Sequence, residues 1–118
     1  MQITLSWPSP ALWDNRRVHW ARKAKAKAAA RNEAFYQVKA AGGRAVSFKR
    51  PRLTFEFFPP HRSRPDCQNL PATQKAAIDG IADALGMDDR TFLCRFPEAL
   101  GEHHPIGRVV VTITEGEE

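Results

Sequence analysis

The alternation of strand-like and helix-like segments is the feature that most constrains how this chain can fold. Apolar and polar side chains alternate with a period of two in residues 1–7, 52–58 and 108–115, as they do in a sheet that is covered on one face. Residues 91–96 form a shorter candidate strand, which follows a tight acidic turn. The pattern therefore predicts strands at these positions.

Two further segments have the composition of helices. Residues 15–41 are rich in strong helix formers and end at a pair of glycines, which stop a helix. Residues 70–85 carry an apolar face, with Asn69 as the predicted N-cap and Gly86 as the predicted stop. That face consists of Leu70, Ala77, Ile78, Ile81 and Leu85.

The order of these segments is β-α-β-α-β-β, which predicts an α+β fold with one small mixed sheet and two helices. A chain of 118 residues fits a single domain, so we assign residues 1–118 to one domain. A core of this size is small, and a homodimer would add buried surface to it.

The charge balance favours an anionic partner. The chain has 18 lysines and arginines against 13 acidic residues, a net charge of +5, and nucleic acid is the first candidate. The alternative is a soluble basic protein with no such partner. The cations concentrate in the first half of the first helix, at Arg16, Arg17, Arg22, Lys23, Lys25, Lys27 and Arg31.

Cations at a helix N-terminus oppose the macrodipole, so this charge does not stabilise the helix. We therefore interpret the segment as a phosphate-facing helix whose charge spreads around it rather than along one stripe. The alternative is an alanine-rich helix that lysines keep soluble.

The remaining composition excludes several classes of protein. Neither Cys67 nor Cys94 lies in a CxxC motif, so no zinc site or disulfide framework is expected, and lone thiols suit a reducing cytoplasm. No apolar run is long enough to span a membrane, and we expect no membrane association and no secretory signal.

Acidic residues stand at two places among the cations. Asp66 lies in a loop beside Arg62 and Arg64, and Asp88-Asp89 follows the second helix. Hard divalent cations take such carboxylates as ligands, and phosphodiester hydrolysis commonly uses these cations, although turn and cap roles for aspartate are also common. The two ends of the second helix are about 24 Å apart. The two acidic sites can meet only if the chain turns back along the helix, or if a dimer partner supplies one of them.

The stretch RSRPDCQNLPATQKAAIDGIADALGMDDRTF, residues 62–92, resembles the core of the RusA-type Holliday-junction resolvases. The N-terminal SWPSPALWDNRRVHW and the closing VTITE are similar to the flanks of that family. The resemblance implies a RusA-like fold and a homodimer that cuts a four-way DNA junction by paired symmetric nicks, using Mg²⁺ or Mn²⁺. It also implies a phage or prophage origin and action in the cytoplasm of the bacterial host, in DNA recombination and repair.

The resemblance also implies roles for single residues. Asp66 matches the first metal-binding aspartate of the family, and Asp89 matches the last, with Asp88 as its partner in the pair. Lys75 matches the catalytic lysine, although "PAT" lengthens the interval before it. The predicted DNA-binding residues are Arg16, Arg17, Arg62, Arg64 and Asn69.

One position departs from the pattern of the family. Gln68 stands where the family has the second aspartate of Asp-x-Asp, so a neutral oxygen replaces a charged one. Three outcomes remain open: an inactive resolvase that still binds junctions, a weakened enzyme, or replacement of the carboxylate by Glu56 or Asp79. The expected function is junction cleavage with Asp66, Lys75, Asp89 and Gln68 at the site, and the alternative is junction binding without useful cleavage.

Overall fold

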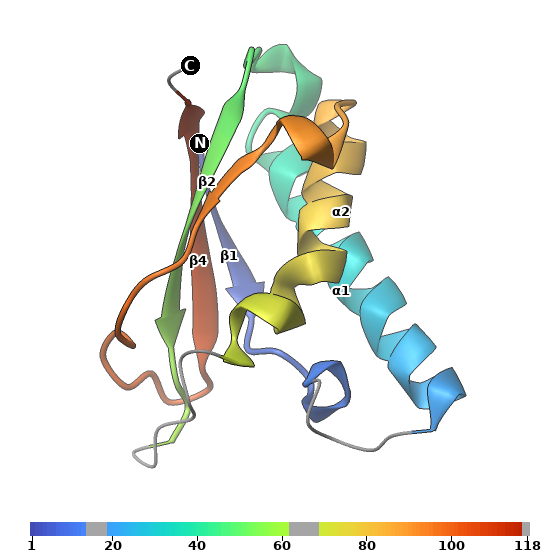
Figure 1. Ribbon diagram of the computed structural model, residues 1–118, viewed down its shortest axis with the longest axis vertical. Helices are drawn as coiled ribbons and strands as arrows, with labels where there is room; N and C mark the ends of the chain where they lie inside the picture. Colours follow the sequence, from blue (N-terminus) through green and yellow to red (C-terminus); the bar gives the residue numbers. More distant parts are fainter. Residues whose placement is uncertain (14–18, 62–68, 117–118) are drawn as a thin grey trace.

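A mixed β-sheet carries two helices on one of its faces (Figure 1). The structure, a computed structural model, describes residues 1–13, 19–61 and 69–116. Within these residues the sheet has four strands in the order β1-β4-β2-β3. The strands are β1 (Gln2–Ser6), β2 (Pro51–Phe58), β3 (Leu93–Arg95) and β4 (Arg108–Glu115). The predicted α+β fold, with its mixed sheet and two helices, is confirmed.

Strand β4 lies inside the sheet and pairs antiparallel with both β1 and β2, whereas β2 and β3 pair in parallel. The period-two pattern determines which side chains face the helices. Leu53, Phe55 and Phe57 are almost completely buried, while Glu56 is exposed because alternate side chains of a strand point to opposite faces. The core between sheet and helices therefore contains the residues that the alternation predicts.

Helix α1 (Trp20–Ala40) begins at His19, whose Nδ1 accepts a hydrogen bond from the backbone of Ala21. Among the residues of α1, Ala34 and Val38 are buried, and both lie in its second half. The first half, which carries most of the lysines, extends away from the sheet (Figure 1). No helix in the described part of the chain is long and apolar enough to cross a membrane.

The second helix begins later than predicted. A 3-10 turn, η4 (Pro71–Gln74), precedes α2 (Lys75–Leu85), and Asn69 is not an N-cap for either element. Both the amide and the hydroxyl of Thr73 donate to the carbonyl of Leu70, at 3.0 and 2.6 Å, and these bonds close a tight turn. Lys75 consequently lies at the first residue of α2.

Gly86 ends α2, as predicted, in the left-handed conformation with a φ of 68°. The amide of Met87 donates to the carbonyl of Ala82, which is the bonding expected where a glycine stops a helix. The chain then reverses through a short 3-10 turn, η5 (Asp89–Thr91), and enters β3. Helix α2 is therefore the crossover between the parallel strands β2 and β3.

Helices α1 and α2 approach each other very closely at Gly80. A Cβ at this position would overlap the carbonyl oxygen of Arg31 and lie 3.1 Å from the Cβ of Ala34. Near this contact Arg31 and Asp83 form a two-bond ion pair between the helices, at 2.7 and 3.0 Å. The absence of a side chain at Gly80 thus determines how near the two helices lie.

Candidate functional site

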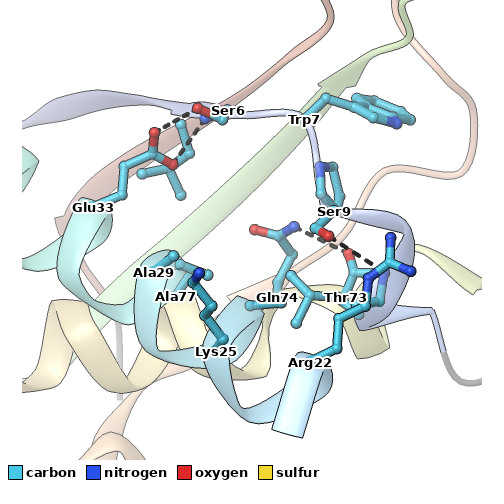
Figure 2. A pocket seen from close by; sticks show the side chains of 16 residues that line it. Ser6, Trp7, Ser9, Arg22, Lys25, Ala29, Glu33, Thr73, Gln74 and Ala77 are labelled. Atoms are coloured by element: carbon cyan, nitrogen blue, oxygen red, sulfur yellow. Dashed lines mark hydrogen bonds between the residues drawn. The ribbon is translucent and has the colours of Figure 1, made fainter. Parts of the chain in front are cut away.

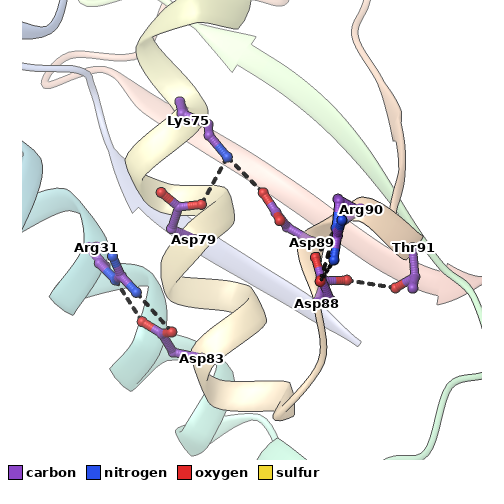
Figure 3. A network of polar contacts seen from close by, with 8 residues as sticks. All are labelled: Arg31, Lys75, Asp79, Asp83, Asp88, Asp89, Arg90 and Thr91. Atoms are coloured by element: carbon purple, nitrogen blue, oxygen red, sulfur yellow. Dashed lines mark hydrogen bonds and ion pairs between the residues drawn. The ribbon is translucent and has the colours of Figure 1, made fainter.

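The ammonium group of Lys75 lies between two carboxylates (Figure 3). Its Nζ is 2.7 Å from Oδ2 of Asp89 and 3.0 Å from Oδ1 of Asp79. Lys75 and Asp79 lie on one face of α2, and Asp89 returns to them because the chain reverses at Gly86. Asp89 therefore reaches the start of α2 because the chain turns back along the helix, which is one of the two ways that the sequence left open.

The two carboxylates keep Lys75 charged. Hydrogen bonds to Asp89 and then to Asp79 raise the pKa of the Lys75 ammonium above its ordinary value of 10.5. The side chain is nevertheless 69% exposed and therefore accessible to a ligand. Such a lysine supplies a fixed positive charge near neutral pH and does not act as a general base.

The same arrangement has the donor atoms for a hard cation. One carboxylate oxygen of Asp79 and one of Asp89 both contact the ammonium of Lys75. The two carboxylates can therefore bind one positive charge together. Mg²⁺ is commonly held by one or two carboxylates together with water and substrate phosphates, so this pair fits it. Within residues 1–13, 19–61 and 69–116, no cluster of three or more histidine, cysteine, aspartate or glutamate residues is arranged for a metal.

Asp88 is used differently from its neighbour Asp89. Its carboxylate accepts hydrogen bonds from the backbone and the guanidinium of Arg90, at 2.9, 3.1 and 2.8 Å. These bonds lower the pKa of Asp88 to about 2. Asp88 therefore caps η5, and its carboxylate bonds Arg90 rather than Lys75 (Figure 3).

Several predicted site residues lie outside the described residues, so their positions relative to Lys75 stay predictions. They are Asp66, Gln68, Arg16, Arg17, Arg62 and Arg64. Asn69 is exposed, while the adjacent Leu70 is completely buried in the core. Glu56 lies on the sheet face opposite the helices, so of the two proposed substitutes for Gln68 only Asp79 lies beside Lys75 and Asp89.

A groove of about 600 Å³ lies between α1 and the start of α2, and Lys75 and Asp79 of this cluster are part of its lining. Lys23, Lys27 and Arg31 line it from α1, and Lys75 and Asp79 line it from α2. Its remaining lining includes the small side chains of Ala28, Ala72 and Ala76, so an extended chain can approach closely. We call it the basic groove.

The interpretation that the charge of α1 spreads around the helix missed this groove. Lys23, Lys27 and Arg31 are spaced four residues apart, which places them on one stripe of an α-helix. That spacing was visible in the sequence. What the sequence did not indicate is that α2 presents Lys75 to the same stripe, because this depends on how the two helices cross.

Comparison with known proteins shows a relative of this chain but names no activity for it. No family model matches the chain. The chain is 44% identical over 115 residues to an uncharacterized protein of Xylella fastidiosa (strain Temecula1), and the match covers 95% of this chain and 74% of that protein. Identity at this level over nearly the whole chain establishes common descent, so the chain belongs to the same family as the Xylella protein.

Proposed function

We propose that this protein is a Mg²⁺-dependent endodeoxyribonuclease of the RusA type, which resolves four-way DNA junctions as a homodimer. The observation that carries the proposal is the contact of Lys75 with Asp79 and Asp89, beside a groove that Lys75 and Asp79 line together with cations of α1. Phosphodiester cleavage needs a cation that neutralises the scissile phosphate, a carboxylate cluster and a path for an anionic chain. These parts lie together here.

The basic groove suits a DNA backbone. Lys23 and Lys27 lie one helical turn apart on α1, and each can neutralise one phosphate of a strand that follows the helix. The small alanines between the helices leave room for sugar and phosphate groups. A strand in this groove would bring one of its phosphates to the ammonium of Lys75, which would offset the negative charge that develops during cleavage.

Asp79 and Asp89, joined by Asp66, would hold the divalent cation. When bound, Mg²⁺ would polarise the scissile phosphate. Asp79 supplies a charged oxygen that Gln68 lacks, so the substitution at residue 68 leaves the cluster with a second carboxylate close to Lys75. Mn²⁺ has similar ligand preferences and would fit the same donors.

The second candidate function is junction binding without useful cleavage. Gln68 removes one charge from the ligand set. In addition, Lys75 is ion-paired with both Asp79 and Asp89, so the lysine and a metal ion compete for the same oxygens. Both features favour a weak metal site in an otherwise intact DNA-binding surface.

Cleavage of a mobile four-way junction in Mg²⁺ or Mn²⁺ distinguishes these two functions. We expect the wild-type protein to cut the junction, and the Gln68→Asp variant to cut it faster at low metal concentration because a restored carboxylate tightens metal binding. The measurement is the initial rate of product formation against metal concentration, with linear duplex as the control substrate. A wild-type protein that binds but never cuts, beside an active Gln68→Asp variant, would establish the junction-binding alternative. Absence of any preference for junctions over duplex would refute the proposed resolvase function.

The salt dependence of binding tests the basic groove. Removing Lys23 and Lys27 together, as the double alanine variant, should lower the slope of log affinity against log salt by about two, because each phosphate contact contributes about 0.9. The matched control is the Lys49→Ala/Arg50→Ala variant, which removes equal charge from exposed residues that precede β2 and do not line the groove. Equal changes of slope in the two variants would show that the groove has no special part in binding.

A further inference from the structure

A second pocket lies against another face of α1 than the basic groove (Figure 2). It has a volume of about 380 Å³ and lies between the segment that follows β1, helix α1 and the start of α2. Thr73 lines both this pocket and the basic groove. Gln74 lines the pocket, and the next residue in the chain is Lys75. The two cavities therefore share a wall at Thr73, in the turn that precedes α2.

The lining of the pocket is mostly apolar, with one buried amide. Leu5, Leu12 and Ala77 contribute apolar surface, and Trp7 contributes an aromatic side chain that packs edge-on against Phe57 at 6.5 Å between ring centroids. The side chain of Gln74 belongs to a residue that is only 3% exposed. Its Nε2 donates to the hydroxyl of Thr73 at 3.1 Å, which fixes the direction of the amide.

Charged groups complete the lining from α1. Arg22 and Lys25 line the pocket on this side, where they would attract a phosphate. The carboxylate of Glu33 accepts hydrogen bonds from the amide and the hydroxyl of Ser6, at 2.9 and 2.5 Å. Both carboxylate oxygens of Glu33 are bonded to Ser6. Arg22 and Lys25 are therefore available to an anionic ligand. The lining thus combines apolar and aromatic surface, a fixed amide and a cationic rim.

We propose that this pocket binds one unstacked nucleobase of the DNA strand whose phosphate lies at Lys75, and we call it the base pocket. The inference rests on the proposed function, because it takes DNA as the partner. A nucleobase has apolar faces that fit the alanine, leucine and tryptophan surface, and polar edges that can bond the Gln74 amide. The volume is at the lower end of the range of about 300–1,000 Å³ in which proteins hold small ligands, as expected for a single base.

The base pocket would give the protein a way to recognise a junction. Stacked bases of a linear duplex cannot enter a pocket in the protein, whereas unstacking costs less where base stacking is already interrupted, as at the centre of a junction. The pocket therefore favours DNA with bases free to leave the stack. Arg22 and Lys25 would hold the phosphate of the nucleotide whose base enters.

Filling the pocket tests the proposal. Ala29 is exposed on α1 and lines the pocket, so Ala29→Phe would occupy the space of the base without altering the core. The matched control is Ala24→Phe, the same substitution at an exposed residue of α1 that lines neither the pocket nor the basic groove. Both variants carry the same cost in helix propensity.

The readout is the affinity of each protein for two four-way junctions, one intact and one with abasic nucleotides at the crossover. The wild-type protein and Ala24→Phe should bind the intact junction about tenfold more tightly than the abasic junction. A factor of this size is the contribution to affinity expected from stacking one base on the protein. Ala29→Phe should lose this difference and bind both junctions with the lower affinity. The same comparison is made with single-stranded oligothymidylate and its abasic counterpart.

Each remaining outcome overturns a stated part of the inference. Equal affinity of the wild-type protein for intact and abasic DNA, or an undiminished difference in Ala29→Phe, would refute the base pocket. A change in the sedimentation mass of Ala29→Phe, with the abasic difference retained, would show instead that the pocket is a contact between subunits. If the wild-type protein shows no preference for junctions, the proposed function fails. The affinities for oligothymidylate and for its abasic counterpart then test by themselves whether the pocket binds a base.

Discussion

Replacing Lys75 with methionine is expected to slow junction cleavage by about 100-fold or more while the protein still binds its substrate. Methionine keeps most of the length and the apolar stem of the side chain but removes the charge that lies 2.7 Å from Asp89 and 3.0 Å from Asp79. A charge placed where negative charge develops in the transition state is worth roughly this much in rate. The measurement is the single-turnover cleavage rate in saturating Mg²⁺.

The stability of the Lys75→Met variant separates a catalytic effect from a structural one. Because the Lys75 side chain is 69% exposed, its ion pairs contribute little to folding, and the unfolding midpoint should remain close to that of the wild-type protein. Lys49→Met, at an exposed residue outside the groove, is the matched control and should cleave normally. Wild-type cleavage by Lys75→Met would remove the lysine from the mechanism and with it the main support for the proposed site.

The pH dependence gives an independent check on the role of Lys75. Its two carboxylate partners raise its pKa above the ordinary value of 10.5, so the ammonium stays charged throughout the neutral and mildly alkaline range. The difference in rate between wild-type protein and Lys75→Met should therefore be constant between about pH 6 and 9. A difference that grew with rising pH would indicate a lysine that acts as a base.

Substituting Gly80 with alanine should destabilise the protein by about 3 kcal/mol, near the upper end of what overpacking usually costs. The added Cβ would overlap the backbone carbonyl of Arg31, which is part of α1 and cannot rotate away as a side chain could. Alanine has the higher intrinsic helix propensity by about 1 kcal/mol, so the net loss understates the cost of the overlap. The free energy of unfolding from urea denaturation measures it.

Asp83→Ala is the control for Gly80→Ala, because it alters the same pair of helices without adding volume between them. It removes the ion pair with Arg31, whose side chains are 51% and 41% exposed, and should cost less than about 1 kcal/mol. If Gly80→Ala were as stable as the wild-type protein, the helices would be able to separate freely, and the width of the basic groove would not be fixed by their contact.

Local patterns predicted those parts of the fold that depend on neighbouring residues. The strand at residues 108–115 and the glycine stop at Gly86 are properties of short segments, and the structure confirms both. The predicted start of α2 at residue 70 was wrong, because the pattern of apolar residues continues through the 3-10 turn in which Thr73 bonds the carbonyl of Leu70. The number of residues per turn is similar in a 3-10 turn and in an α-helix, so the spacing of apolar residues does not distinguish the two.

The sequence predicted several residues of the candidate site but not which of them are in contact. The resemblance to resolvases named Lys75 and Asp89, yet their contact depends on β3 pairing in parallel with β2, which no short stretch of sequence reveals. Asp79 was considered as a substitute for Gln68, and its spacing of four residues from Lys75 predicts an ion pair between the two, which the structure confirms. Its position beside both residues follows from the helical spacing of four residues after Lys75 together with the return of the chain.

The reversal at Gly86 also limits how the length of this segment can vary among relatives. Inserting one residue between Lys75 and Gly86 would rotate Lys75 by about 100° around the helix axis relative to Asp89 and shift it by about 1.5 Å. After such a change the lysine would face away from the carboxylate. Relatives that keep this contact between lysine and carboxylate should therefore keep the number of residues from Lys75 to Asp89 unchanged, even where the residues between them differ.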